Sequence, residues 1–551
     1  MKINKEKLIL FFILLLAIFL RFYQLGQVPP SPDWDEAALG YNAYSILKTG
    51  RDEYGAKLPL ILRSFDDYKP AIYVYLLILP IKFLGMDLWV VRLPAAVIGV
   101  LAVWLTYLLV KELFSETSWS GFLALVVAFL LAISPWHLQF SRAAFETGVG
   151  MFVNILIAIL FLKGLRKPCL LLLAAFFAGL NIYIYQAEKI FTPLLVLVLV
   201  LIWRQKLFSL PRRWLILAVM IGLLTLVPFA KLALTTPEVF TRAKGTSFAS
   251  DQTVFLSRTV QKLVRDKEHN DYLGLVLDNR RLTYLISFVS GWLSHFDLNW
   301  LFLFGDDTRH HAPGMGLLYL VELPFFLWGI YALVFELKDK KTKALLLTWF
   351  LLAPIPAAFS SGVPHAIRSL RFLPIIQIIV GLGVIHFWSW LKSKSAWLKF
   401  SLIMGLSAAF VFNFAYYLSQ YLIQLNYFDS SFWQYGYQEA VEIVKNIESK
   451  YDQIIVSNEP HLDQSYMFFL YYLQYDPVVY QRQGGTISGG FREDRNSFSK
   501  YVFRPIKWDK EERSGQILYI GRPDDFPGDK SVVKTVDFLN GQPAIKIVEG
   551  Q

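Results

Sequence analysis

Two neighbouring carboxylates and a lysine form the group of side chains best suited to chemistry in this chain. Asp35 and Glu36 follow a first apolar stretch, and Lys69 stands directly before Pro70. A carboxylate can take a proton from a hydroxyl group, and a lysine can stabilise an anion such as phosphate. Ionisable groups next to a membrane are costly, so packing alone does not explain them. They predict a catalytic site. A helix cap is the plain alternative for Asp35, because residues 37–44 favour a helix.

The composition is that of a polytopic membrane protein. Of the 551 residues, 55% are hydrophobic and only 18% are charged, and the mean hydropathy is +0.43. The aromatic content of 16% fits helices that end in interfacial belts. A net charge of +11 could indicate nucleic acid, but basic cytoplasmic loops explain it, and we expect no nucleic-acid partner. The single Cys169 excludes a disulfide within the chain and any multi-cysteine metal site.

Hydropathy predicts about eleven transmembrane helices. The apolar stretches long enough to cross a bilayer are 8–26, 91–110, 120–137, 145–162, 169–186, 190–203, 214–233, 315–336, 344–360, 372–391 and 398–421. Lysine or arginine occurs in every short loop that this count places in the cytoplasm. We therefore expect a cytoplasmic N-terminus and an extracytoplasmic C-terminus. Counting 71–85 as a span would reverse every later loop, so 71–85 and 283–304 are expected to be outer, juxtamembrane helices.

The positions of the loops and the tail predict two domains. The long outer loops are 27–90 and 234–314. In the tail, residues 436–451 have helical periodicity, and short strands are expected at 454–456, 478–480, 517–520 and 544–548. We expect a transmembrane domain over 1–425 and a small soluble α/β domain over 426–551. The expected location is the plasma (inner) membrane.

Further cations and histidines of the outer loops are candidates for substrate binding. Lys69, Arg142 and Arg368 could bind a phosphate, whereas Arg92 and Arg371 fit interfacial anchors at span ends. His310 and His311, near Asp306 and Asp307, could bind a divalent metal, although their spacing matches no known ligand pattern. The remaining candidates for a substrate contact are Tyr68, Glu146 and His365. Glu146 and Glu188 could instead pair with Arg142 and Lys189.

Several motifs carry a family resemblance. They are the acidic pair, Tyr68-Lys69-Pro70, Arg92-Leu93-Pro94-Ala95, Phe140-Ser141-Arg142, residues 310–316 and Pro364-His365-Ala366-Ile367-Arg368. In these motifs the chain resembles the superfamily of dolichyl-phosphate-mannose protein mannosyltransferases and aminoarabinose transferases, which are C-type membrane glycosyltransferases with the GT-C fold. The resemblance covers residues 1 to about 425. The tail carries no motif of the family.

The resemblance implies a mechanism and its partners. The donor would be a sugar on a polyprenyl phosphate reached from membrane lipid, and the acceptor a hydroxyl of a protein, lipid or glycan. Asp35 corresponds to the general base of an inverting transfer, Glu36 to the second acid, and Lys69 to the lysine that contacts the donor phosphate. The aminoarabinose transferases follow their acidic pair with arginine and tyrosine, whereas this chain has Ala37 and Ala38.

Elementary chemistry supports the same roles. A phosphate leaving group is already ionised and needs no general acid, so one carboxylate and nearby cations suffice. We therefore expect no cofactor, with a divalent metal as an open alternative. The rival function is a transporter or flippase of lipid-linked sugars, which often shows related halves and charges within its spans. A non-catalytic scaffold is the third alternative. The absence of a visible repeat and the charges in the outer loops favour the enzyme.

Overall fold

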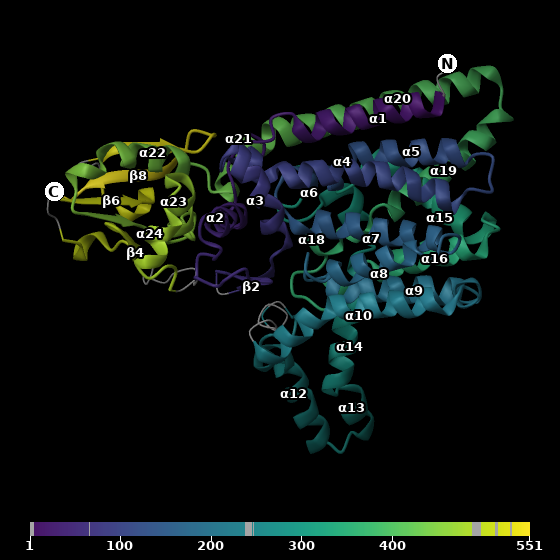
Figure 1. The fold of residues 1–551 in the computed structure, drawn as a ribbon, viewed down its shortest axis with the longest axis horizontal. Helices are drawn as coiled ribbons and strands as arrows, with labels where there is room; N and C mark the ends of the chain where they lie inside the picture. The colour runs from purple at the N-terminus through teal and green to yellow at the C-terminus, as the bar shows by residue number, and fades with distance from the viewer. Residues whose placement is uncertain are drawn as a thin grey trace. The chain divides into compact units, whose positions relative to one another are not determined.

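The computed structural model describes residues 5–65, 67–236, 245, 247–487, 497–512, 516–528 and 532–550. The chain divides into two compact units (Figure 1). The helical unit contains residues 1–17, 99–139 and 147–414, and the mixed unit contains residues 18–98, 140–146 and 415–551. The tail thus packs in the same unit as the first long loop. The predicted domain boundary at residue 425 stays a prediction.

Helices, many of them apolar, make up most of the helical unit and of the segments that enter it. Their bounds are α1 Lys5–Phe22, α4 Leu88–Leu113, α5 Ser120–Ile133, α6 Pro135–Arg142, α7 Glu146–Gly164, α8 Leu170–Asn181, α9 Glu188–Phe208, α10 Arg212–Thr235, α15 Leu323–Tyr331, α16 Lys340–Leu352, α17 Ile355–Ala358, α18 Ala366–Ser369, α19 Ile375–Lys392 and α20 Ala396–Ser419. Three more helices, α12 Gln252–Glu268, α13 Tyr272–Leu277 and α14 Arg280–Ser294, lie between α10 and α15.

Each of the eleven predicted spans contains a helix. Among the described residues, six helices are long and apolar enough to cross a membrane, or seven if α5 and α6, bent by 56°, count as one span. Several predicted spans are broken into shorter helices, as at Pro354 between α16 and α17. A multi-pass membrane protein is therefore supported, and the number of eleven crossings stays a prediction.

The N-terminal part of the mixed unit builds a small platform. Helix α2 (Trp34–Thr49) is followed by the antiparallel hairpin β1 (Ile61–Ser64) and β2 (Asp67–Pro70), and then by α3 (Ile72–Leu84). Helix α3 is the outer helix predicted over 71–85, and its position relative to a bilayer stays a prediction. Lys69 lies opposite Leu62 in the hairpin, so its position is fixed by a strand register. Asp66, part of the motif before Lys69, lies outside the described residues.

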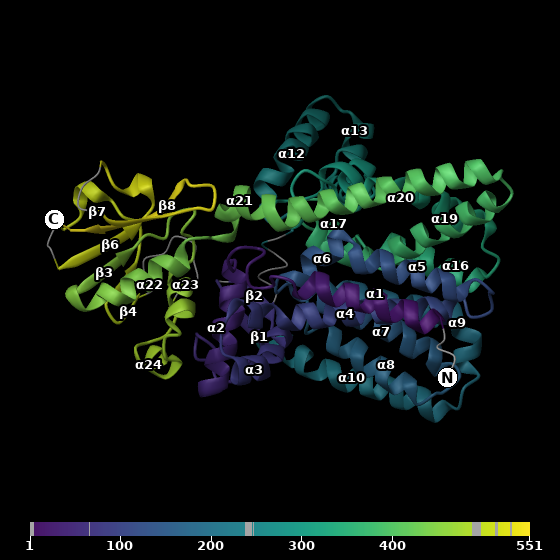
Figure 2. The ribbon, with the colours of Figure 1, turned by 90° about the horizontal axis from the view of Figure 1, so that it is seen from above.

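The tail forms the small α/β structure that the sequence predicts (Figure 2). Its six-stranded sheet has the order β4-β5-β3-β6-β8-β7, in which β3 is parallel to β5 and β6 and the other pairs are antiparallel. The strands are β3 Gln453–Val456, β4 Ser497–Phe498, β5 Tyr501–Phe503, β6 Ile517–Gly521, β7 Val532–Asp537 and β8 Pro543–Glu549. The helices are α22 Tyr437–Ile447, α23 Ser465–Leu473 and α24 Pro477–Arg482.

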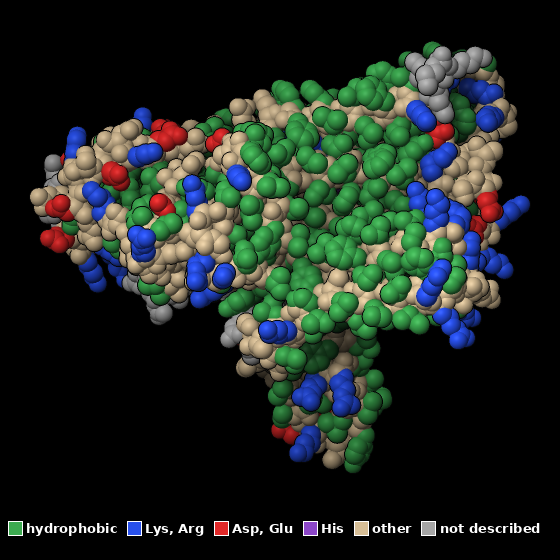
Figure 3. All heavy atoms as spheres, viewed as in Figure 1, with side chains coloured by type: hydrophobic (Ala, Val, Ile, Leu, Met, Phe, Trp, Pro, Cys, Tyr) green, Lys and Arg blue, Asp and Glu red, His purple; other side chains and the backbone are tan. Residues whose placement is uncertain are grey.

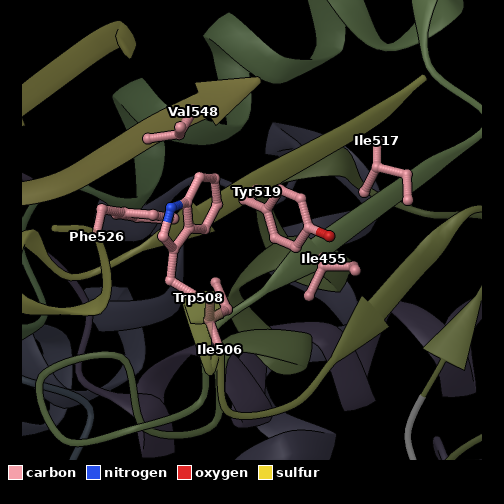
Figure 4. Close-up of a cluster of buried hydrophobic side chains, with 7 residues drawn as sticks. All are labelled: Ile455, Ile506, Trp508, Ile517, Tyr519, Phe526 and Val548. Carbon is pink, nitrogen blue, oxygen red and sulfur yellow. The ribbon is translucent and has the colours of Figure 1, made fainter. Parts of the chain in front are cut away.

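One predicted strand is wrong, and the reason is local. Residues 478–480 belong to α24, because Asp476 caps the helix by accepting from the Val478 amide and Pro477 occupies its first turn. The predicted strands at 454–456, 517–520 and 544–548 are confirmed as parts of β3, β6 and β8. A buried cluster holds this sheet together, with the Trp508 ring 5.2 Å from that of Tyr519 and 5.1 Å from that of Phe526 (Figure 4).

Candidate functional site

The first turn of α2 places the two predicted acids. Asp33, and not Asp35, is the cap: its side chain accepts from the Glu36 amide at 2.8 Å, and the Glu36 carboxylate accepts from the Asp33 amide at 3.4 Å. This reciprocal capping box satisfies two amides that the helix leaves unpaired. The capping alternative for Asp35 is therefore wrong.

Asp35 forms an ion pair with Lys69. The pair joins α2 to β2, with its lysine side chain 11% exposed and its aspartate side chain 34% exposed. The carboxylate is therefore reachable, whereas most of the lysine chain is packed. A basic carboxylate beside a positioned cation is the arrangement that proton removal next to an anionic leaving group requires.

Glu36 has a different environment from its neighbour. Its carboxylate oxygens lie 2.8 Å from two guanidinium nitrogens of Arg92. Glu36 Oε1 also accepts from the Ala144 amide at 2.8 Å. Glu36 and Arg92 are 1% and 0% exposed. Arg92 donates further to the carbonyls of Leu25, Pro29 and Ser31. The sequence indicated an interfacial anchor at Arg92, and this is wrong. Arg92 is instead the centre of a buried network that holds the loop before α2.

Arg142, a predicted phosphate ligand, lies in a similar buried position. Its guanidinium donates to the carbonyls of Leu20 at 2.6 Å and Val28 at 3.2 Å, and only 1% of the residue is exposed. It also lies over the Tyr421 ring, 5.4 Å from the centroid. Capping the end of α1 with a cation is favourable because carbonyls there lack helical partners. The geometry favours a structural role for Arg142 in place of the predicted phosphate contact.

Tyr68 and Glu146 are the other predicted residues in the mixed unit. Tyr68 is partly buried in β2, and its amide donates to the Asp67 carboxylate at 2.8 Å. Glu146 is partly buried at the first position of α7. A substrate contact stays a prediction for both residues.

Asp306, His310 and His365 of the helical unit come together in the structure. The Asp306 carboxylate accepts from His310 Nδ1 at 3.1 Å and from the Ala366 amide at 2.5 Å, and His365 Nδ1 lies 3.7 Å away. Ligand atoms of these three residues lie within 4.8 Å of one another and could hold a metal ion. Carboxylate and imidazole groups suit zinc or manganese. His311 lies beside this cluster, with Nδ1 3.1 Å from the Asp307 carbonyl oxygen.

The protonation states of this cluster follow from its burial. Burial lowers the pKa of His365, and the nearby Arg368 guanidinium lowers it further. Burial raises the pKa of Asp306, but the hydrogen bond and charge of His310 outweigh this and bring the pKa below its ordinary value. A neutral His365 and an ionised Asp306 are the forms that coordinate metals.

Arg368 and Arg371 have separate environments in the helical unit. Arg368, predicted to bind phosphate, is partly exposed and donates to the Ser361 carbonyl at 3.0 Å. Because Arg368 belongs to a different unit from Asp35 and Lys69, their convergence on one cavity stays a prediction. Arg371 is fully buried and lies 3.2 Å from the Glu188 carboxylate.

The pairing predicted between Glu188 and Lys189 and the interfacial anchor predicted for Arg371 are therefore wrong. Glu188 pairs with Arg371 and accepts from Asn154 Nδ2 at 2.6 Å. Lys189 donates to Gln186 Oε1 at 2.5 Å. Lys189 occupies the next helical position after Glu188 and faces about 100° away, so it does not reach the buried carboxylate that Arg371 pairs with.

Glu53 is the residue that sequence reasoning missed. It is completely buried, and its carboxylate accepts from Thr486 Oγ1 at 2.8 Å, Asn42 Nδ2 at 3.0 Å and the Tyr466 hydroxyl at 3.3 Å. Burial raises the pKa of Glu53 to about 7. Its partners come from α2 and from the tail, so Glu53 ties the tail to the helix that carries Asp35. The local sequence resembles an ordinary polar turn, and the only signal is an acid surrounded by other charged residues.

Comparisons with known proteins show which sequences and structures this chain is similar to. Residues 68–231 match the model of the family described as dolichyl-phosphate-mannose-protein mannosyltransferase. The putative mannosyltransferase YkcB of Bacillus subtilis (strain 168) is 30% identical over 179 residues, which cover 29% of this chain and 24% of that protein. The chain thus matches about a quarter of the length of this curated relative.

Two solved structures have a similar fold. ArnT from Cupriavidus metallidurans, bound to undecaprenyl phosphate, matches with a TM-score of 0.54 and 13% identity, covering 98% of this chain and 97% of that one. The oligosaccharyltransferase AglB from Archaeoglobus fulgidus, in complex with an inhibitory peptide and a dolichol-phosphate, matches with a TM-score of 0.52 and 12% identity, covering 94% and 69%. The chain therefore shares the fold of these two solved structures, and part of its sequence is similar to the mannosyltransferase family.

Proposed function

We propose that this protein is an inverting glycosyltransferase that moves a sugar from a polyprenyl phosphate to an acceptor hydroxyl on the non-cytoplasmic side of the membrane. The observation that carries the proposal is the reachable ion pair of Asp35 and Lys69. It supplies a base and a cation at one place, as this reaction requires. The N-terminus is inferred to be cytoplasmic and the tail extracytoplasmic, in agreement with the positive loops.

The proposed step uses each group once. The Asp35 carboxylate takes the proton of the acceptor hydroxyl, and the hydroxyl oxygen attacks the anomeric carbon from the face opposite the phosphate. The bond between the anomeric carbon and the phosphate oxygen breaks, and the phosphate leaves with the bonding electrons. Lys69 stabilises the phosphate through a charge-assisted hydrogen bond. No proton donor is needed, since the leaving phosphate is a stable anion.

The ion pair itself gives a reason for ordered binding. Without donor, Lys69 is paired with the Asp35 carboxylate. A donor phosphate competes for Lys69 and thereby releases the carboxylate to contact the acceptor hydroxyl.

Glu36 is assigned a positioning role in this proposal rather than a chemical one. Its carboxylate is engaged by Arg92 and by the Ala144 amide, and its side chain is only 1% exposed. It fixes the first turn of α2 and thereby the direction of Asp35. This refines the expectation that both acids of the pair act in catalysis.

The relatives support the donor class. The ArnT structure binds undecaprenyl phosphate, and the AglB complex contains a dolichol-phosphate. We infer that this chain also takes a lipid-linked phosphate donor. For the acceptor, a protein, a lipid and a glycan all fit a base that acts on a hydroxyl group.

The test compares the native protein with Asp35→Asn on a panel of radiolabelled polyprenyl-phosphate sugars. We expect the variant to lose about 10²- to 10⁴-fold in transfer rate, the usual contribution of a general base. Asp87→Asn, which changes an exposed carboxylate in the same unit, is the control and should keep its rate. Unchanged transfer by a correctly folded Asp35→Asn protein would remove the assignment of the base.

A further inference from the structure

Helix α14 of the segment α12–α14 has one face that packs against other helices of the helical unit. The Phe288 ring lies 4.6 Å from that of Phe359, and Trp292 Nε1 donates to the Leu351 carbonyl at 2.9 Å. A Cβ on Gly291 would lie 3.2 Å from the Ala358 carbonyl oxygen. One side of α14 is therefore held against α16 and α17. Figure 1 shows α12 and α13 extending away from that contact.

A second face of α14, beside the packed one, is apolar and exposed. Leu285, Ile286, Val289 and Leu293 are 55%, 59%, 39% and 54% exposed. Their spacing of one, four and eight residues from the first places them on one side of a helix. Among the described residues, no other element covers this stripe.

The preceding helix α13 also exposes apolar side chains. Its exposed side chains are Tyr272, Leu273, Val276 and Leu277, each more than half exposed. Soluble surfaces rarely keep so many large aliphatic side chains together unless a partner covers them. We call the eight residues on α13 and α14 the aliphatic stripe.

Cations accompany the stripe (Figure 3). Arg258, Lys267, Arg280 and Arg281 are exposed and make no ion pair with any residue that the structure describes, whereas Lys262 pairs with Asp278. An exposed apolar face next to unpaired lysine and arginine is the pattern of helices that lie in the interface of a membrane with anionic lipids.

We propose that the aliphatic stripe lies in the boundary between headgroups and acyl chains of the membrane, with the four unpaired cations on anionic phospholipid headgroups. The segment follows α10, none of whose residues is buried against protein, and precedes α15, so both of its ends are attached to predicted spans. The stripe is aliphatic except for one tyrosine, unlike the aromatic and arginine anchors that dominate protein interfaces. This inference rests on membrane insertion and is independent of the reaction.

The experiment measures the surroundings of single labels in the full chain. Cys169→Ser removes the only cysteine, and Val276→Cys, Val289→Cys and Lys534→Cys then each receive an environment-sensitive fluorophore. Lys534 is an exposed residue of β7 and serves as the matched control. The labelled proteins are placed in vesicles of phosphatidylethanolamine and phosphatidylglycerol, with or without brominated acyl chains.

Brominated lipid should quench the labels at 276 and 289 at least about threefold more than the label at 534. Iodide in the buffer should give the reverse order. Equal iodide quenching at all three positions would show a solvated stripe, and protection from both quenchers would show a protein partner or a second copy. Either result overturns the proposal. If Val289→Cys fails to fold, Leu285→Cys, on the same stripe, takes its place.

Discussion

Asp35 and Glu36 are adjacent in the chain, yet their surroundings differ in every respect that matters for chemistry. Asp35 pairs with a lysine and keeps 34% of its side chain exposed, whereas Glu36 pairs with a fully buried arginine and is 1% exposed. Consecutive residues on a helix point about 100° apart, which is enough to send one carboxylate to the surface and the other into the core. A shared motif therefore does not imply a shared role.

The partners account for the difference. Lys69 is a flexible point charge that a phosphate can draw away, and Arg92 is a planar group whose donors are all directed at Glu36 and at three carbonyls. The first pair can open for a substrate at little cost. The second cannot open without leaving a charge buried and unpaired.

The largest effect is expected from opening the buried pair. Arg92→Met leaves the Glu36 carboxylate without its cation, which costs about 3–5 kcal/mol of unfolding free energy. Denaturant unfolding in detergent measures this loss, and Lys48→Met, an exposed lysine of α2, is the control. The double variant Glu36→Gln with Arg92→Met should recover part of the loss, since no charge remains buried. Equal stability of Arg92→Met and the native protein would contradict the comparison.

Glu53 adds a third case to this comparison, because it is a buried carboxylate whose hydrogen-bond donors are all neutral side chains. Its pKa of about 7 lies above the ordinary value of 4.5. Between about pH 4.5 and 7 the folded state therefore holds a proton that the unfolded state releases, so stability is highest below this window and falls by about 3 kcal/mol as the pH rises through it. Glu53→Gln should remove this part of the pH dependence.

The measurement for Glu53 is a series of unfolding curves between pH 4 and 8, compared between variants. Glu439→Gln changes an exposed acid of α22 and should keep the native slope. If Glu53→Gln kept that slope as well, another group would have to titrate in this range, and the pKa assigned to Glu53 would be wrong.

Breaking the reachable pair should affect turnover more than stability. We expect Lys69→Met to lower the transfer rate by about 10- to 100-fold, the effect of losing one charge-assisted contact to a developing anion. Its melting temperature should change little, since a partly exposed ion pair contributes about 1 kcal/mol or less. Lys69→Arg keeps the charge and should recover part of the rate, and Lys82→Met, on α3, is the control. A large loss of stability with no loss of rate would make this pair structural.

Local patterns were sufficient for much of the fold. The apolar helices and the strands 454–456 and 517–520 are determined by residues near one another in sequence, and hydrophobic patterns predict them. The error at 478–480 has the same origin, because Val478-Val479-Tyr480 has β propensity while the cap before it starts a helix. Propensity is a weaker signal than a cap followed by proline.

Partners far apart in sequence could not be predicted. Arg92 meets Glu36 across 56 positions, Arg371 meets Glu188 across 183, and Thr486 meets Glu53 across 433. Each acid looks like a surface residue in its own segment, and only the fold reveals its burial. The sequence therefore identifies the acids and cations as chemical groups, whereas the structure decides which of them are accessible.

The smallest effect is expected from removing metal ions. Asp35 and Lys69 supply the base and the cation, so exhaustive chelation should leave the transfer rate within about twofold of the untreated value. A loss above tenfold that zinc or manganese restores would contradict this. Asp306→Asn should then cause the same loss, because Asp306 belongs to the described cluster that could hold a metal, and the exposed Asp307→Asn should not. In that outcome a metal ion would balance the charge on the leaving phosphate. The metal site would then be needed for transfer in addition to the Asp35–Lys69 and Glu36–Arg92 pairs.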